Sequence, residues 1–490
     1  MPVTPPAARA AEAIPSADQP SAARGLSTTA VLVIACAAQF MVVLDVSIVN
    51  VALPAMRDTL HLTPAGQQWI VNAYTLGFAG LLLLGGRAAD LVGSRRAFLT
   101  GLTAFTLASL VGGLADSSGT LIAARAVQGV GGAILAPATL TLIMTTFTEP
   151  AARTRAMGAW SAVMAAGGAA GAVVGGILTQ YAGWRWVLFV NVPLGVLLLV
   201  ASLRYLPAAS GVRGGLRRLD LPGALSVTAG LTVLVYGIIC TETKAWSSPS
   251  VWGSLLAGAV LLGLFVLIES RVAHPLVPLA ILRRRTLATA NVLVIAMGAA
   301  SFAMWFILSL YFQQVLHYSA QTAGLCFVPG SLAIILGAQI GTRIIGRTGP
   351  RPLLVTGLTI STAGFLWMSL IRPDGSFVVD ALGPFVLCTF GVGLAMMPST
   401  VAATSGTARA EAGLASGLVN TSRQVGGALG LAVLATLASH TTATRLAAHP
   451  DQLSAALTAG YGRALLVAAA FTAFAALGAL TLPGRARSTE

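Results

Sequence analysis

The chain has 490 residues, of which 56% are hydrophobic and only 9% are charged. Because soluble proteins carry about 25% charged residues, this composition excludes a soluble globular fold and predicts an all-α polytopic membrane protein. The net charge is +14, from 29 basic and 15 acidic residues. The basic residues lie in short segments between apolar runs and form no nucleic-acid-binding motif, so membrane topology explains the charge better than a nucleic-acid partner.

Apolar windows of about 20 residues recur along the chain, each long enough to cross about 30 Å of hydrocarbon. We predict fourteen spans, near residues 30–53, 67–86, 97–115, 120–145, 157–178, 186–206, 221–240, 251–268, 287–312, 321–345, 352–371, 379–400, 413–438 and 461–482. With the N-terminus inside, 21 Lys and Arg residues fall in inside segments, six fall outside and two lie within spans. This bias predicts an N-in, C-in chain with an even number of spans.

An internal repeat divides the chain into two halves. GGRAADLVGSRRAFLTGLT begins at Gly85, and GTRIIGRTGPRPLLVTGLT begins 256 residues later at Gly341. Parallel repeats with a substrate site between them are typical of transporters. The predicted organisation is a disordered cytoplasmic tail over 1–28, a six-helix bundle over 29–206, two extra spans over 207–268, a cytoplasmic amphipathic connector over 269–286, a second six-helix bundle over 287–482 and a cytoplasmic tail over 483–490.

The first span holds one charged residue, Asp45, among residues 31–54. An ionised group within hydrocarbon costs roughly 2.5–3.5 kcal/mol on insertion scales, so such a residue marks a functional site by default. The alternative is a carboxylate that lies beside a water-filled vestibule.

The loop after the second span reads GRAADLVGSRR and has the glycines and charges of a conformational latch. Its candidate gating residues are Gly86, Arg87, Asp90, Gly93, Arg95 and Arg96. Gly93 permits a tight turn, and Asp90 can face Arg95, Arg96 or a helix N-terminus. The alternative is that the arginines only fix the topology.

The fourth span places Arg125 and Gln128 on one helical face with small residues. This face must be buried, and Arg125 reaches a depth similar to that of Asp45. We predict that the two side chains pair directly or through water and that the pair sets the proton affinity of Asp45. A purely structural buried ion pair is the alternative.

Small residues in the fifth span allow close helix packing, which alone explains most of that pattern. The stripe contains Gly167, Gly171, Gly175 and Gly176. A polar patch in the thirteenth span holds an arginine that either lines a central cavity or binds backbone carbonyls. The candidate cavity-lining residues are Met41, Gln128, Asn420, Arg423 and Gln424.

The sequence has no signature of ATP binding, metal binding or catalysis. The pattern GxxxxGK[ST] is absent, and no His, Cys, Asp or Glu cluster has metal-ligand spacing. No nucleophile–base pair indicates an enzyme. We therefore expect neither a cofactor nor a metal, and an ion gradient as the energy source.

Several motifs together resemble the major facilitator superfamily, and more narrowly its fourteen-span drug:proton antiporter branch. They are LDVSIVNVALP (44–54), QQWIVNAYTL (67–76), GRAADLVGSRR (86–96), the Arg125/Gln128/Gly129 face, GWRWVLFVNVPLG (183–195) and ESRVAHPLVPLAILRRR (269–285). The resemblance implies two six-helix bundles that rock about a central cavity. It also implies proton coupling by Asp45 and Arg125 and gating by the loop at 86–96. Ala172 stands where the antiporter motif has Pro, and Leu91 stands where a basic residue is common.

The sequence therefore predicts an exporter of a lipophilic drug or antibiotic that exchanges its substrate for protons in a bacterial cytoplasmic membrane. We expect it to act as a monomer whose partners are the small lipophilic substrate, protons and the lipid bilayer. The alternative is a gradient-coupled permease for a small nutrient or metabolite, which would need more polar side chains in the central spans. A membrane sensor or lipid-modifying enzyme would need a soluble domain or a catalytic constellation.

Overall fold

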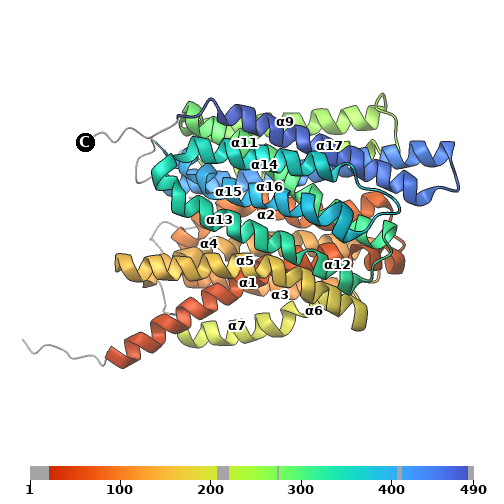
Figure 1. Cartoon of the computed structure of the whole chain (residues 1–490). Coiled ribbons are helices and arrows are strands. Elements are labelled where there is room, and N and C mark those ends of the chain that lie inside the picture. The colour runs from red at the N-terminus through yellow and green to blue at the C-terminus, as the bar shows by residue number, and fades with distance from the viewer. Residues whose placement is uncertain (1–20, 207–219, 273–274, 406–410, 484–490) are drawn as a thin grey trace, which may run out of the picture.

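The computed structural model describes residues 21–206, 220–272, 275–405 and 411–483. Within these ranges the secondary structure is helical, without a strand, and Figure 1 shows the helices running side by side. Most of the predicted tails at 1–28 and 483–490 lies outside the described residues, but residues 21–28 begin the first helix.

The helices up to residue 205 form a first bundle. α1 packs against α5, and α4 packs against both α2 and α3. The bundle comprises α1 (Ser21–Leu60), α2 (Pro64–Val92), α3 (Ser94–Gly113), α4 (Ser118–Thr146), α5 (Pro150–Tyr181), the short α6 (Trp186–Phe189) and α7 (Asn191–Tyr205). Since the apolar residues of these helices face one another, they bury a shared core that a single amphipathic helix could not form.

The helices from residue 285 onward form a second bundle. α11 packs against α16 and α17, and α15 packs against α13 and α14. The bundle comprises α11 (Arg285–Leu310), the π-helical η2 (Tyr311–Val315), α12 (Ala320–Cys326), α13 (Val328–Thr348), α14 (Pro350–Met368), η3 (Phe377–Ala381), α15 (Leu382–Thr404), α16 (Ala412–Ala448) and α17 (Leu453–Ala479).

An extra helix pair lies between the bundles in sequence. α8 (Leu221–Cys240) contacts α2 and α16, whereas α9 (Pro249–Arg271) packs mainly on α8 and exposes apolar side chains such as Trp252 and Leu256. The connection between α8 and α9 is tied to α2, because Gln68 Nε2 donates to Glu242 Oε1 at 2.5 Å. Burial raises the pKa of the Glu242 carboxyl group. The short α10 (Leu279–Leu282) follows before the second bundle.

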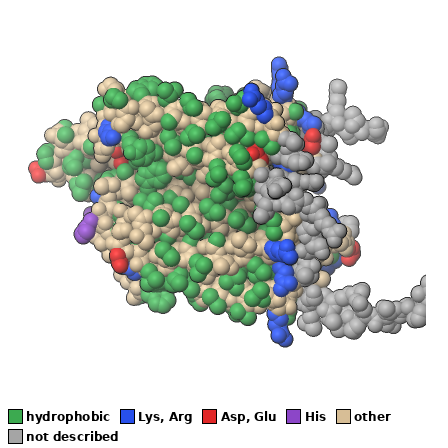
Figure 2. Space-filling view, turned by 180° about the vertical axis from the view of Figure 1, so that it is seen from behind, with side chains coloured by type: hydrophobic (Ala, Val, Ile, Leu, Met, Phe, Trp, Pro, Cys, Tyr) green, Lys and Arg blue, Asp and Glu red, His purple; other side chains and the backbone are tan. Residues whose placement is uncertain are grey.

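Thirteen helical segments within the described ranges are long and apolar enough to cross a membrane. α14 is not among the thirteen, although it packs between α15 and α17 in the second bundle. The count of fourteen spans and the N-in, C-in orientation therefore stay predictions. Figure 2 shows that most basic side chains on one face of the molecule lie toward one end, beyond a broad hydrophobic band.

The internal repeat is visible in two glycine turns. Gly93 joins α2 to α3 with φ of 98°, and Gly349 joins α13 to α14 with φ of 79°. Both φ values lie in a region that side chains with a Cβ atom rarely adopt. The offset of 256 residues that relates the two sequence segments therefore relates two turns of the same kind.

Gly93→Ala and Gly349→Ala are each expected to destabilise the protein by about 1–3 kcal/mol, because Ala is strained at these φ values. The check is the melting temperature of the purified protein in detergent. Gly346→Ala is the matched control, since this helical glycine has no neighbouring atom within 4 Å of an added Cβ. Gly346→Ala should be neutral or slightly stabilising. Equal melting temperatures for all three variants would contradict the strain argument.

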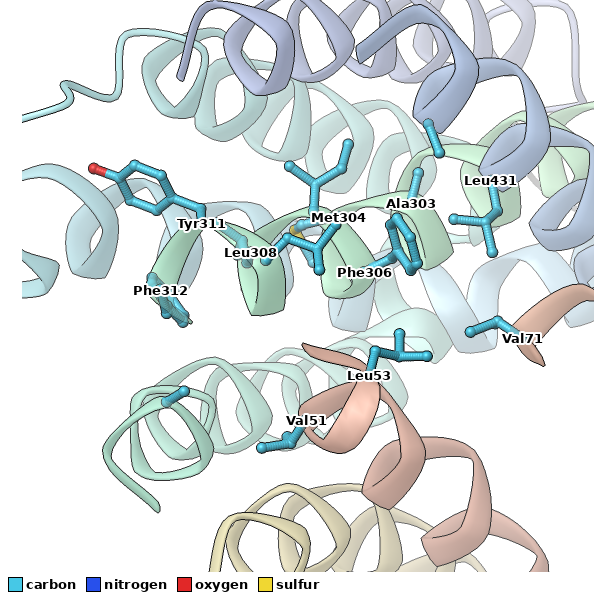
Figure 3. Close-up of a cluster of buried hydrophobic side chains, with 14 of the residues drawn as sticks. Val51, Leu53, Val71, Ala303, Met304, Phe306, Leu308, Tyr311, Phe312 and Leu431 are labelled. Carbon is cyan, nitrogen blue, oxygen red and sulfur yellow. The ribbon is translucent and has the colours of Figure 1, made fainter. Parts of the chain in front are cut away.

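One contact between the two bundles lies at an end of the molecule. We call the end at which α1 passes into α2, residues 60–64, the outer end, following the predicted orientation. Val51 and Leu53 of α1 belong to one buried hydrophobic cluster with Phe306 of α11 and Phe312 of η2 (Figure 3). This cluster draws residues from both bundles, so it joins the bundles at the outer end.

Hydrogen bonds and close helix packing reinforce this outer contact. Among the described residues, Ser309 Oγ donates to the Asn50 carbonyl oxygen at 2.7 Å, and Gln313 Nε2 donates to that of Val51 at 3.0 Å. An added Cβ at Gly176 of α5 would lie 2.5 Å from the Ala320 carbonyl oxygen of α12. Toward the inner end, the bundles also touch along α2 and α16, where Leu81, Leu83 and Leu84 of α2 pack against the hydrophobic cluster of the second bundle. The bundles are therefore closed against each other at the outer end.

Candidate functional site

Asp45 and Arg125 form a buried ion pair inside the first bundle. The Arg125 Nη1 to Asp45 Oδ2 distance is 2.5 Å, and the side chains are 2% and 0% exposed, respectively. The predicted pairing is thus present and direct. Arg125 also donates from Nε to the Ile70 carbonyl oxygen at 3.3 Å, and its guanidinium lies 4.4 Å from the centroid of the Tyr74 ring.

Three neutral side chains complete the surroundings of the carboxylate. Gln128 Nε2 and Asn191 Nδ2 donate to Asp45 Oδ1 at 3.1 and 2.8 Å. Gln128 Nε2 also lies 2.6 Å from Ser109 Oγ, and its Oε1 accepts from Arg125 Nη1 at 3.0 Å. Both carboxylate oxygens therefore have donors, which reduces the cost of holding an ion pair away from water.

Five helices supply this site: α1, α2, α3, α4 and α7. A carboxylate beside a water-filled vestibule was the alternative considered for Asp45 in the sequence analysis. In the structure its carboxylate points into the first bundle and is sealed from solvent. Proton exchange with either side of a membrane would therefore require the first bundle to open or rearrange.

Sequence reasoning missed Asn191 and Ser109. Both are fully buried, and both contact the network around Asp45. Asn191 lies within the motif GWRWVLFVNVPLG, where it is the only amide side chain. An isolated amide in an apolar run was the available signal, because a buried amide in hydrocarbon needs a polar partner.

The predicted gating loop binds backbone oxygens of neighbouring segments. Arg87 Nη1 donates to the Pro275 carbonyl oxygen at 2.5 Å, and Arg95 Nη2 donates to that of Leu203 at 2.7 Å. The connector is fixed further by Glu269, whose Oε2 accepts from the Val277 amide at 3.0 Å. The loop thus contacts both the end of α7 and the connector to the second bundle.

The other residues of the predicted gating loop make fewer contacts than Arg87 and Arg95. Asp90 and Arg96 are exposed, and no ion pair among the described residues involves Asp90. Gly86 is half-buried near Pro137, and Gly93 provides the turn. The expected contact of Asp90 with Arg95 or Arg96 is therefore not among the described ion pairs.

The glycine stripe of α5 packs against α1 and α12. An added Cβ at Gly171 or Gly175 would lie 2.8 Å from the carbonyl oxygen of Leu44 or Ile48, respectively. Gly167 faces Phe40, while Gly176 faces the second bundle through Ala320. The stripe therefore places two helices at backbone contact beside the segment that carries Asp45, and its outer end touches both bundles.

Residues 35–431 match the family described as the Major Facilitator Superfamily. This match covers most of the chain. The chain belongs to the major facilitator superfamily. It is accordingly a multi-pass protein of the cell membrane.

Relatives within the superfamily are similar to the chain over most of their length. It is 44% identical over 465 residues to the cephamycin export protein CmcT of Amycolatopsis lactamdurans, covering 94% of each chain. It is 42% identical over 421 residues to the puromycin resistance protein pur8 of Streptomyces alboniger, covering 85% of this chain and 83% of that protein.

A solved superfamily structure shares the fold. A bacterial homolog of the human lysosomal transporter Spinster, in an inward-facing and unoccupied conformation, superposes with a TM-score of 0.64 at 14% identity. The comparison covers 94% of this chain and 97% of the other. At this identity, the likeness supports the two-bundle fold alone.

The candidate cavity-lining residues have different surroundings. Met41 and Gln128 are fully buried, Met41 in the hydrophobic core of the first bundle and Gln128 beside Asp45. On α16, Asn420 is exposed, and Arg423 and Gln424 are half-buried. The structure thus separates a sealed polar site in the first bundle from an accessible polar patch in the second.

Proposed function

We propose that the chain exports a lipophilic drug or antibiotic across the cytoplasmic membrane in exchange for protons. The observation that carries the proposal is the sealed Asp45–Arg125 pair. Asp45 lies within a span and has donors on both oxygens: Arg125 on Oδ2 and the neutral amides of Gln128 and Asn191 on Oδ1. Protonation would remove one charge from a balanced pair, which changes how tightly α1, α4 and α7 are held together.

Two further observations support export by alternating access. The relatives named above are an export protein and a resistance protein. The bundles meet at the outer end through an apolar cluster and hydrogen bonds. In the proposed cycle, substrate enters from the cytoplasm. Proton release and uptake at Asp45 then shift the balance between the inward-open and the outward-open state, and the outer contact opens. The coupling network lies within one chain, which supports function as a monomer.

The test uses purified protein in liposomes with an imposed pH gradient. We expect substrate movement against its gradient when the opposite face is acidic, and loss of that movement when a protonophore is added. In an efflux-deficient bacterial host, expression should lower the accumulation of a lipophilic dye. A rise in accumulation would instead indicate an importing permease and would contradict the proposal.

A further inference from the structure

Arg423 lies at mid-depth in the second bundle. It is the twelfth residue of α16, about 16 Å from the helix start at 1.5 Å per residue. Its carbonyl oxygen packs against Gly298, near the middle of α11, where a side chain with a Cβ atom would not fit without a shift. The neighbouring Ser422 donates to Asn291 of α11 at 2.7 Å, which fixes the orientation of α16.

The face of α16 that holds Asn420 and Gln424 points between the bundles. Leu431 lies in the outer cluster with Leu53 of α1 and Phe306 of α11 (Figure 3). Gln424 and Asn420 precede Leu431 by seven and eleven positions, which places each within about 20° of Leu431 around the helix. Arg423 precedes Leu431 by eight positions and lies about 80° away, toward α11. Toward the inner end, this face changes from a buried leucine to accessible polar side chains. Asn420 and Gln424 therefore lie beneath the outer contact, and Arg423 lies beside them at the edge of the helix face that packs on α11.

The Arg423 guanidinium has no partner within the described part of the chain. None of the ion pairs found there includes it, and its shielded Nε has no hydrogen-bond acceptor. Apart from Asp45, every acidic residue of the chain lies in a terminal segment, in a connection or close to a helix end. Asp45 is already paired with Arg125. Among the described residues, no other carboxylate is therefore available to Arg423 at this depth.

Arg423 differs from Arg125 in the number of its partners. Arg125 has a carboxylate, an amide oxygen, a backbone oxygen and an aromatic face as partners. An arginine within a membrane span without such partners is costly to keep, and it gains most from a ligand that supplies a negative charge. The amide groups of Asn420 and Gln424 add neutral donors beside it.

We propose that Arg423 binds the carboxylate of a lipophilic anionic substrate, with Asn420 and Gln424 as further donors. The planar guanidinium fork matches a carboxylate and can bind both of its oxygens. This deepens the proposed export function by naming a substrate class, and it rests on that function for its biological meaning. Lipophilic dications are disfavoured at this patch because the nearest charge is positive.

The test is a binding measurement with two matched fluorescent probes, N-dansyl-phenylalanine and its methyl ester, which differ by one negative charge. Fluorescence anisotropy with the purified full-length protein in neutral detergent gives both affinities. The wild type should bind the acid about tenfold more tightly than the ester, equivalent to about 1.4 kcal/mol. Arg423→Gln should remove this preference by weakening acid binding alone, and Arg423→Lys should retain part of it.

Two controls separate ligand binding from a structural role. Arg445→Gln removes an exposed arginine from the same helix and should behave like the wild type. Without ligand, Arg423→Gln should melt at or above the wild-type temperature, because it removes a half-buried charge that has no partner among the described residues. A lower melting temperature together with equal loss of both probes would show a structural role and overturn the proposal.

Two further outcomes would also overturn it. One is an unchanged preference for the acid in Arg423→Gln. The other is displacement of the acid probe from the wild type, but not from Arg423→Gln, by phosphatidylglycerol at equal concentration, which would show a lipid headgroup site. The binding assay needs no pH gradient. Failure of this inference is therefore distinguishable from failure of proton-driven export, which the liposome experiment tests.

Discussion

Asp45→Asn is expected to abolish efflux driven by a pH gradient while leaving gradient-independent exchange of substrate in place. Asn has nearly the same shape and keeps an oxygen for Asn191 and Gln128, but it cannot carry a proton between two charge states. Coupling free energies between two ligands typically correspond to 5–150-fold effects, so loss of coupling should lower gradient-driven efflux by about a hundredfold. The measurement is gradient-driven transport against substrate counterflow in the same liposomes.

Measuring both gradient-driven transport and counterflow separates a loss of proton coupling from a loss of folding. Asp45→Glu retains an ionisable group one methylene longer and should keep part of the coupling. Retained counterflow shows that Asp45→Asn is folded and able to change conformation. Full gradient-driven efflux in Asp45→Asn would contradict the proton-carrying role, whatever the structural importance of the ion pair.

The charged pair was predictable from the sequence because charges within hydrocarbon are costly. A lone acid in one span and a lone arginine in another have few ways to be accommodated, and pairing at similar depth is one of them. Asn191 and Ser109 could not be placed in the same way. The isolated amide of Asn191 indicates that it needs a polar partner but not which one, and a serine such as Ser109 can satisfy its hydroxyl locally on its own helix backbone.

Helix boundaries and local helix geometry were less predictable from the sequence. α1 continues through Pro54 to Leu60, and α16 runs for 37 residues, well beyond the predicted span. Hydropathy reports the hydrocarbon-embedded part of a helix and carries no information on where hydrogen bonding ends. The π-helical turns at Tyr311–Val315 and Phe377–Ala381 likewise have no periodicity signal of their own. The glycine turns were predictable, because the repeat aligned Gly93 with Gly349.

The sealed position of Asp45 changes the role expected of Arg125. An acid beside an open cavity could be hydrated after loss of its partner, but one within the first bundle cannot. Gln128 and Asn191 donate only neutral hydrogen bonds to the carboxylate. Arg125 is therefore expected to be required for stability as well as for coupling, and these two requirements can be separated by mutation.

Arg125→Gln should destabilise the protein by about 3–5 kcal/mol, the usual cost of removing one partner from a buried ion pair. Asp45→Asn/Arg125→Gln should recover most of this loss, since replacing both charges leaves no uncompensated ion. The double variant should nevertheless remain uncoupled, because it has no carboxylate to carry the proton. Arg125→Lys should keep part of the coupling while losing the Nε bond to Ile70. Melting temperatures in detergent and gradient-driven efflux in liposomes measure the two properties.

The double variant is the decisive arm of this experiment. A double variant that is no more stable than Arg125→Gln would show that Arg125 stabilises the bundle through Ile70, Tyr74 and Gln128 rather than through Asp45. Gradient-driven efflux in the double variant would move the proton site elsewhere in the chain. Recovered stability together with lost coupling would assign both functions to the one pair: Arg125 makes a carboxylate tolerable inside the first bundle, and the carboxylate is kept there because it exchanges a proton.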